Sequence, residues 1–565
     1  MPSARIPLTS LLPLCLLAAC SQPPETDGRA ADEETAALVA RAGAPLFDGM
    51  GEYHREITTT DPGAQRYFDQ GMVLAFAFNH AEAIRSFRAA QRLDEQCAMC
   101  FWGEALATGP NINVTSNGKT IMSREEQIAA YAALEKARAL ASSASEVERD
   151  LIAALGERYG ATPVEDRGSL ERAYAEALGE LAARYPEDDD IAGMFAEAWM
   201  NTMPWDYWSD GETPRPETVP VIAALERILA RNPRHPHVLH LYIHAVEASS
   251  NPGRAEEEAD ALTTLVPGAG HLVHMPAHIF WRVGRYHDAA EANVRAAAVD
   301  EAYIAQCNAQ GFYPAMYYPH NIHFLWAAAS MEGRSAVAID AARKVAANVR
   351  LAQIDQFPAV EFFHTIPLLA LVQFGRWDEV LAEPEPRADL AYSAAIRHYA
   401  RGVAYAGKGD LAGARAEHAA LVPLKDNDRV MVINGNGYPA VALLAIADEL
   451  LLGEIALAEG ANDTAIAHFT TAVEGQDALP YMEPPFWYYP TRQSLGLALL
   501  RADRAAEAEQ VYRRDLETYP HNGWSTYGLI QSLEAQGKTN EANMHREHFA
   551  AMWSLADVDL SASRL

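Results

Sequence analysis

Two sets of three histidines repeat along the chain at an interval of 34 residues. Each set has spacings of three and four, which place its three rings along one face of a helix. Imidazole is the commonest metal ligand among protein side chains, and two neighbouring helices can together supply three or four ligands to one ion. The spacing therefore predicts a metal site. The two sets are His237, His240 and His244, and His271, His274 and His278.

The residues around these histidines narrow the choice of metal. No aspartate or glutamate lies within either set, which disfavours calcium and magnesium. Histidine-only sites suit copper and zinc, and three histidines per ion occur in coupled dicopper oxygen sites and in catalytic zinc sites. Glu247, one turn past His244, is a candidate ligand or orienting group. We favour copper as the cofactor, with zinc and iron as alternatives.

Several interpretations of the histidines remain open. A metal site with an open coordination position would make the protein a metal-dependent oxidoreductase, whereas full ligation would make it a metal binder or store. The histidines could instead line a metal-free groove for a polar ligand, because crowded neutral imidazoles need hydrogen-bond partners. They could also be structural residues that were copied when the repeat was duplicated.

A second group of chemically active residues is Cys97, Met99 and Cys100. Phe101 follows them, which excludes the haem-attachment motif because that motif requires histidine there. Two thiols at this spacing can form a disulfide, exchange electrons, or bind a soft ion such as Cu(I) together with a methionine. We favour the disulfide, since an exported protein meets an oxidising compartment.

The elements that position the histidines are helical repeats. The stretch HLVHMPAHIFWRVGRYHDAAEANVRAAAVDEAY has Gly284 at its turn, with Ala289 and Ala296 where small residues allow two helices to close. This pattern and its period resemble the tetratricopeptide repeat (TPR) family. The resemblance implies an all-α fold, a TPR-type α-solenoid superhelix of about nine or ten helix-turn-helix repeats. It also implies that the six histidines line the concave groove.

The resemblance extends over nearly the whole chain. Counting back from Gly333 places His320 and His323 on the same groove face, and His364 lies beside it. Apolar residues three and four apart predict further helices at about 124–142, 145–160, 167–185 and 189–202. The order of phrases such as HMPAHIF and EPPFWYYP is similar to that of histidine-rich bacterial TPR lipoproteins to which no function is assigned.

The N-terminus resembles a bacterial lipoprotein signal. Arg5 precedes a short apolar stretch that is too short to span a membrane, and Leu17-Ala18-Ala19-Cys20 matches the lipoprotein processing box. The resemblance implies a signal peptide over 1–19 and lipidation of Cys20. It also implies attachment, by this lipid alone, to the periplasmic face of the outer membrane. Residues 20–50 are predicted to be a flexible acidic tether.

The remaining chain divides into an N-terminal helical region, an aromatic loop, the histidine-rich region and a C-terminal TPR array. The formal net charge of −31 argues against nucleic acid as a partner, since nucleic acid requires a basic surface. Besides a metal ion, the alternative partner is an envelope protein or peptide bound by a TPR scaffold. The four expected ranges are 51–202, 203–217, 218–370 and 371–565.

Overall fold

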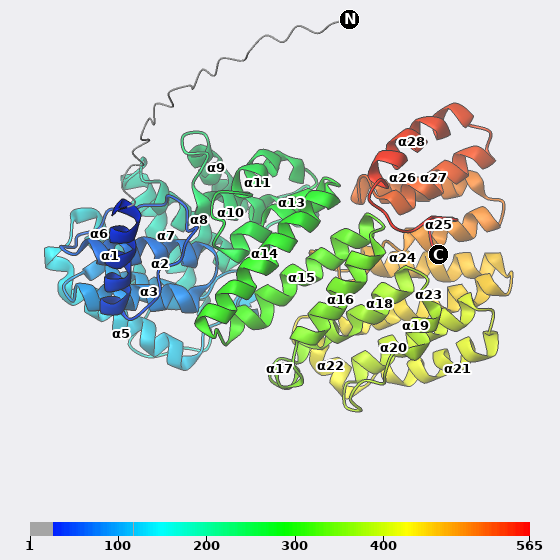
Figure 1. The fold of residues 1–565 in the computed structure, drawn as a ribbon, viewed down its shortest axis with the longest axis horizontal. Helices are drawn as coiled ribbons and strands as arrows, with labels where there is room; N and C mark the ends of the chain where they lie inside the picture. The colour runs from blue at the N-terminus through cyan, green and yellow to red at the C-terminus, as the bar shows by residue number, and fades with distance from the viewer. Residues whose placement is uncertain (1–25, 117) are drawn as a thin grey trace, which may run out of the picture.

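The protein is a continuous array of helices in the computed structural model, which describes residues 26–116 and 118–565 (Figure 1). Its N-terminal part begins with α1 and ends with the helices before the aromatic loop. A short antiparallel hairpin pairs Thr115 with Thr120 in the loop after α4. The elements are α1 Thr26–Ala42, α2 Pro62–Phe76, α3 His80–Leu93, α4 Ala98–Thr108, β1 Thr115–Ser116, β2 Lys119–Thr120, α5 Arg124–Leu140, η1 Ala141–Ser143, α6 Glu146–Leu155, α7 Gly168–Arg184 and α8 Asp189–Thr202.

The middle part carries the clustered histidines and combines short helices, such as α12 and α13, with the long helices α14 and α15. The segment 203–217 is a loop between α8 and α9, and the indole N–H of Trp208 donates to the carbonyl of Ala245 at 2.8 Å. The elements are α9 Thr218–Leu229, α10 Pro236–Val246, η2 Pro252–Ala255, α11 Glu256–Leu262, α12 Gly270–His274, α13 Pro276–Arg282, α14 Tyr286–Cys307, α15 Phe312–Met331 and α16 Ser335–Asn348.

The C-terminal part continues the same succession of helix pairs at the other end of the molecule's long axis (Figure 1). Its elements are α17 Leu351–Gln356, η3 Pro358–Thr365, α18 Ile366–Gln373, α19 Trp377–Ala382, α20 Ala391–Gly407, α21 Leu411–Leu421, η4 Val422–Leu424, α22 Asp428–Gly435, α23 Ala440–Ala458, α24 Asn462–Asp477, α25 Arg492–Arg501, α26 Ala505–Thr518, α27 Gly523–Ala535 and α28 Thr539–Met552.

Glycines that face aromatic rings explain how the helix pairs stack. The ring of Phe87 on α3 is fully buried, and a Cβ atom at Gly71 on α2 or Gly103 on α4 would lie 2.7 or 2.4 Å from it. Tyr512 on α26 lies against Gly496 on α25 in the same way. Each second helix thus packs between its own partner and the first helix of the next pair, which is the nearest-neighbour stacking of a solenoid. The predicted all-α, TPR-type solenoid is confirmed.

The prediction of a flexible tether over 20–50 is wrong for the part that the structure describes. Most of this segment is helix α1, and Leu38 and Ala42 are buried against the first helix pair. The carbonyl of Gly49 accepts a hydrogen bond from the amide of Gly268 at 2.8 Å. Apolar residues four apart on α1 outweigh the acidic composition because they bury one face of the helix.

The predictions for the N-terminus stay predictions. The signal peptide over 1–19 and the lipidation of Cys20 fall outside the described residues. Among the described helices, none is long and apolar enough to cross a membrane.

The chain ends in a non-helical segment that folds back from α28 over its neighbours. The Asp557 carboxylate accepts hydrogen bonds from the amides of Ser335 and Ala336, at 2.6 and 2.9 Å, at the start of α16. Ser563 and Arg564 are buried, and the Ser563 hydroxyl donates to the carbonyl of Gln493 on α25 at 2.9 Å. The C-terminal segment therefore connects α28 to both α16 and α25.

Candidate metal centre

Six of the nine predicted histidines converge in two clusters of three. The first cluster combines rings from both 34-residue units, and the second combines rings from the second unit with one ring from the repeat that follows. In each cluster, one candidate ligand atom per residue lies within 4.8 Å of the others. The clusters differ from the two sets in the sequence. His271 lies with His240 and His244 of the earlier set, and His320 lies with His274 and His278. The first cluster is His240, His244 and His271, and the second is His274, His278 and His320.

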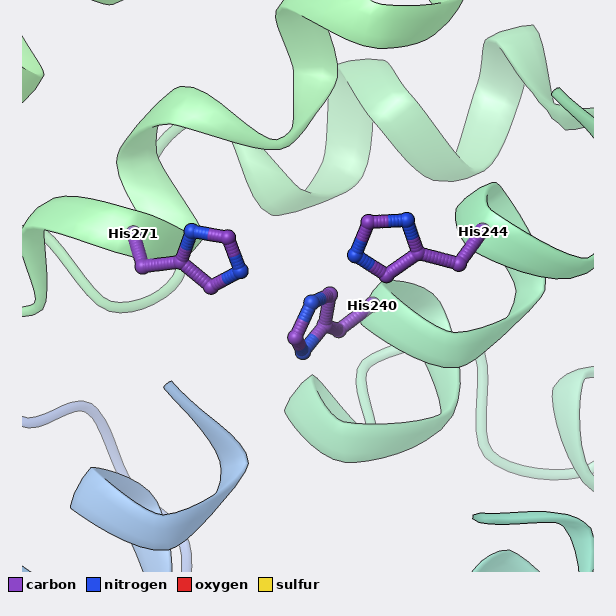
Figure 2. Close-up of side chains that lie close together, drawn as sticks. All are labelled: His240, His244 and His271. Atoms are coloured by element: carbon purple, nitrogen blue, oxygen red, sulfur yellow. The ribbon is translucent and has the colours of Figure 1, made fainter. Parts of the chain in front are cut away.

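Two of the helices that present these rings, α10 and α13, are short and begin with a proline. Pro236 occupies the first position of α10, which carries His240 and His244. A second proline, Pro276, is the first residue of α13, which follows α12 directly. Proline is tolerated at the start of a helix, but it has no backbone N–H to donate within a continuous helix, so the two helices are separate. Figure 2 shows His240 and His244 projecting from α10 toward His271 on α12.

In the first cluster, outer hydrogen bonds fix which nitrogen of each ring faces the centre. His240 Nδ1 lies 2.7 Å from the carbonyl oxygen of Phe76, and His244 Nδ1 lies 3.0 Å from Glu247 Oε1. Both oxygens are acceptors, so Nδ1 carries the proton in each ring and Nε2 carries the lone pair. Within the described residues, neither Nε2 atom has a hydrogen-bond partner, although both are buried.

His271 completes the first cluster. The ring is 2% exposed, and both of its nitrogens lack a partner in the part of the chain that the structure describes. Its backbone amide donates to the Tyr313 hydroxyl at 3.2 Å, and that hydroxyl donates to Asp300 at 2.9 Å. The ring packs edge-on against Tyr317. Three buried imidazoles therefore present unpaired nitrogens to one another, an arrangement that is costly without a ligand.

In the second cluster, the outer partners are an amide and two carboxylates. His274 Nδ1 lies 2.7 Å from Asn293 Oδ1, and Asn293 Nδ2 donates to the Ala289 carbonyl at 2.8 Å. The amide orientation makes Nδ1 the donor and leaves the lone pair of His274 on Nε2. That atom is 2.9 Å from His278 Nε2.

His278 connects the second cluster to the first through Glu247. Its Nδ1 lies 2.7 Å from Glu247 Oε2 and 3.3 Å from Glu483 Oε2. The other oxygen of Glu247 holds His244, so one buried carboxylate contacts both clusters. The distance of 2.7 Å between His278 Nδ1 and Glu247 Oε2 is that of an ion pair, but the angle at the N–H is too bent for a hydrogen bond.

Burial decides the charge of most rings. Desolvation is the main cause that holds the pKa values of His240, His271, His274 and His320 well below their usual range. These rings are therefore neutral at pH 7, which is the form that binds metals. Burial also opposes charge on His278, but the nearby carboxylates outweigh it and raise the pKa of this ring to about 10.

The carboxylate between the clusters is held in its charged form. Burial acts to raise the pKa of Glu247, but His278 and His244 outweigh this effect and lower the pKa to about 2. Glu483 differs, because burial raises its pKa more than contact with His278 lowers it. The centre thus combines neutral imidazoles with one ion pair between His278 and Glu247.

Three of the predicted histidines lie elsewhere. His237 stacks on Phe76, with ring centroids 4.3 Å apart, and its Nε2 contacts Glu197 at 3.1 Å. His323 packs among aromatic rings that include Phe363. His364 Nε2 lies 2.6 Å from the carbonyl oxygen of Val349.

The histidines were expected to line the concave groove, and in the structure most of the clustered rings are buried from solvent. His240 and His274 are fully buried and His244, His271 and His278 are nearly so, because the chain closes over them from two directions. Phe76 and Phe78 of the first helix pair cover the first cluster, and the segment after α24 covers the second through Glu483.

The structure contains the disulfide that was favoured for the two cysteines. Cys97 and Cys100 are bonded to each other at the start of α4, so neither offers a thiolate to a metal. Met99 is fully buried in the N-terminal core. The soft-ligand interpretation of these three residues is therefore wrong for this state of the protein.

Sequence reasoning missed the outer partners of the rings. Glu483 lies in the EPPFWYYP phrase, but nothing in the helical period connects that phrase to His278. The Phe76 contact uses a backbone carbonyl, which leaves no signal in the residue type. Asn293 was detectable in principle, because it is a polar residue four positions after Ala289 on the small-residue face of α14.

Comparisons with known proteins return only weak structural similarities. No protein-family model and no curated protein matches it. Among solved structures, a chain of the APC/C hetero-tetramer Cut9–Hcn1 is 14% identical, with 93% of this chain and 78% of that chain covered and a TM-score of 0.31. Human IFIT1 with m7Gppp-AAAA is 13% identical (92% and 95% covered, TM-score 0.32), and yeast Tom70 is 12% identical (87% and 93%, TM-score 0.26). Values this low carry no information about function.

Proposed function

We propose that this helical-repeat protein binds a transition-metal ion between His240, His244 and His271. The observation that carries the proposal is the set of unpaired, buried imidazole nitrogens that face one another in the first cluster. A histidine that binds a metal through one ring nitrogen characteristically donates a hydrogen bond from the other to a carbonyl or carboxylate. His240 donates in this way to the carbonyl of Phe76, and His244 donates to the carboxylate of Glu247. A purely structural histidine would use its inner nitrogen as well.

Copper is the metal that we favour, with zinc and iron as alternatives. Three neutral imidazoles without a direct carboxylate ligand suit copper and zinc better than calcium or magnesium. Three protein ligands leave a fourth position for water or a substrate, so a metal-dependent oxidoreductase remains within the proposal. In either role the chain's own contribution is to hold three rings in place and to exclude bulk water.

Elemental analysis of the full chain, purified without a histidine tag and dialysed against a weak chelator, tests the proposal. We expect at least one copper, zinc or iron ion per chain, and loss of this ion in the His240→Ala, His271→Ala double variant. His237→Ala is the matched control, because His237 is equally buried on the same helix but faces Glu197. A wild-type protein that takes up none of the three metals, or a double variant with unchanged metal content, contradicts the proposal.

A scaffold that binds an envelope protein or peptide is the second candidate. The solenoid fold favours it, and the chain's own C-terminal segment lies as a non-helical peptide against α25 with Ser563 and Arg564 buried. A peptide of residues 556–565 should bind a variant that lacks these residues, as measured by fluorescence anisotropy. Absence of binding removes the observation that supports this candidate.

Export and lipid attachment through Cys20 complete the proposal. The processing box at residues 17–20 supports them, and the Cys97–Cys100 disulfide fits an oxidising compartment such as the periplasm.

A further inference from the structure

We propose that a second metal ion binds between His274, His278 and His320, next to the first and linked to it by Glu247. This inference rests on the proposed function for its chemistry, but its ligands are different residues. It assigns Glu483, on the far C-terminal side of the chain, to the support of the second ion.

Two imidazoles of the second cluster contact each other directly. The Nδ1 atoms of His274 and His278 face acceptors, namely Asn293 Oδ1 and the carboxylates of Glu247 and Glu483. Both Nε2 atoms therefore carry lone pairs when the rings are neutral, and these atoms are only 2.9 Å apart. Without a metal, this contact requires a proton that His278 Nε2 donates to His274 Nε2, and a metal ion bound to both nitrogens would replace that proton. One nitrogen of His320 lies within 4.8 Å of one nitrogen of each of these rings and provides the third ligand.

The charges beside the second cluster also favour a bound cation. The carboxylates of Glu247 and Glu483 are both buried, with Glu247 fully so. Buried charges require compensation because water cannot solvate them. Arg282 is the nearby fixed cation, but its guanidinium donates to the backbone carbonyls of Glu247 and Ser249. In the metal-free protein the proton on His278 balances this charge, and a divalent ion bound to His278 would take the place of that proton.

The carboxylate of Glu247 supports both clusters. Glu247 Oε1 contacts His244 of the first cluster at 3.0 Å, and Oε2 contacts His278 of the second at 2.7 Å. The ring centroids of His244 and His278 are 5.6 Å apart, and those of His271 and His274 are 5.8 Å apart. Ions in the two clusters would thus be close neighbours, and two Cu(II) ions would couple magnetically.

The two ions would differ in access to solvent. A cavity of about 230 Å³ lies beside Glu483, with Trp281, Phe486 and Trp487 in its walls. Tyr481 and Met482, which also line it, are 39% and 46% exposed, so the cavity reaches the surface. The first cluster is covered instead by Phe78 and Tyr317. The second ion should therefore exchange faster than the first.

Copper titration of the full chain, followed by elemental analysis and electron paramagnetic resonance, tests the inference. We expect two ions per chain in the wild type, one in His320→Ala and one in His240→Ala. His323→Ala should retain two, because this ring lies on the same helix as His320 but packs against Phe363. A chelator should remove copper from the wild type in a fast and a slow phase, and His320→Ala should lack the fast phase.

The outcomes separate the two proposals. One ion in both the wild type and His320→Ala overturns the second ion and leaves the first in place, with His278 then protonated between its partners. Two ions retained in His320→Ala also overturn the inference, whereas no ion in the wild type overturns the proposed function itself. If His320→Ala loses its helical circular dichroism, Glu483→Gln replaces it. This variant should weaken only the second ion, about 10- to 100-fold, and equal affinity for both ions contradicts the inference.

Discussion

Glu247→Gln is the substitution that most directly tests how the centre is held. The carboxylate places one oxygen 3.0 Å from His244 Nδ1 and the other 2.7 Å from His278 Nδ1. Glutamine keeps the shape but offers one oxygen and one NH2 group. The NH2 group would face an N–H, so one of the two rings must turn or lose its outer partner.

The expected effect follows from the number of rings that lose support. Loss of one outer partner typically weakens metal binding about 10- to 100-fold, which corresponds to about 1.4 to 2.7 kcal/mol. Glu247→Gln should therefore weaken the ion beside the affected ring by this amount. The measurement is a competitive titration of copper or zinc against a chromophoric chelator at constant pH.

Glu171→Gln is the matched control for the loss of a buried carboxylate. Glu171 is 2% exposed and pairs with Arg158 at 2.9 Å and with Arg167 at 2.7 Å, among helices that precede the histidine region. We expect a lower melting temperature in this variant with unchanged metal affinity. Wild-type metal affinity in Glu247→Gln, or the same loss in Glu171→Gln, would refute the reasoning.

Two further predictions concern stability. Burial raises the pKa of Asp515 to about 7, so between about pH 4 and pH 7 the folded protein keeps a proton that the unfolded chain releases, and stability falls as pH rises through this window. Asp515→Asn should remove this slope and gain about 2 to 3 kcal/mol relative to wild type between pH 5 and pH 8, as measured by urea denaturation at each pH; a parallel pH dependence in both proteins would contradict the assignment. Replacement of Cys97 and Cys100 by serine should cost about 2 kcal/mol, as a very short disulfide loop implies, and leave the metal content unchanged. Loss of metal in this variant would restore the soft-ligand interpretation.

The fold could be predicted because the signals of a repeat are local. Gly284 marks a turn in the sequence, and in the structure it has a φ of +80° between α13 and α14. The helices predicted at 124–142 and 189–202 are observed as α5 and α8, with ends that agree within two residues. Each signal depends on residues a few positions apart, so no knowledge of the distant chain is needed.

The centre could be predicted only in part, because it depends on how successive repeats rotate past one another. The spacing of the histidines identified the rings but not their grouping, because His271 lies with His240 and His244 and not with the later members of its own set. Closure over His240 by the carbonyl of Phe76 depends on contact between residues that are far apart in the sequence. Glu483 could not be connected to His278 for the same reason. Which metal binds stays a prediction.

The position of Glu483 in the sequence has a consequence for the order in which the protein is built. Neighbouring repeats can fold as soon as both have been synthesised, so the six clustered histidines and Glu247 can assemble while the C-terminal array is still missing. The segment that brings Glu483 to His278 is synthesised more than 160 residues after His320. During that interval, one side of the centre would remain open to water and to small ions. The segment that carries Glu483 would then close the metal centre only after the ions have bound.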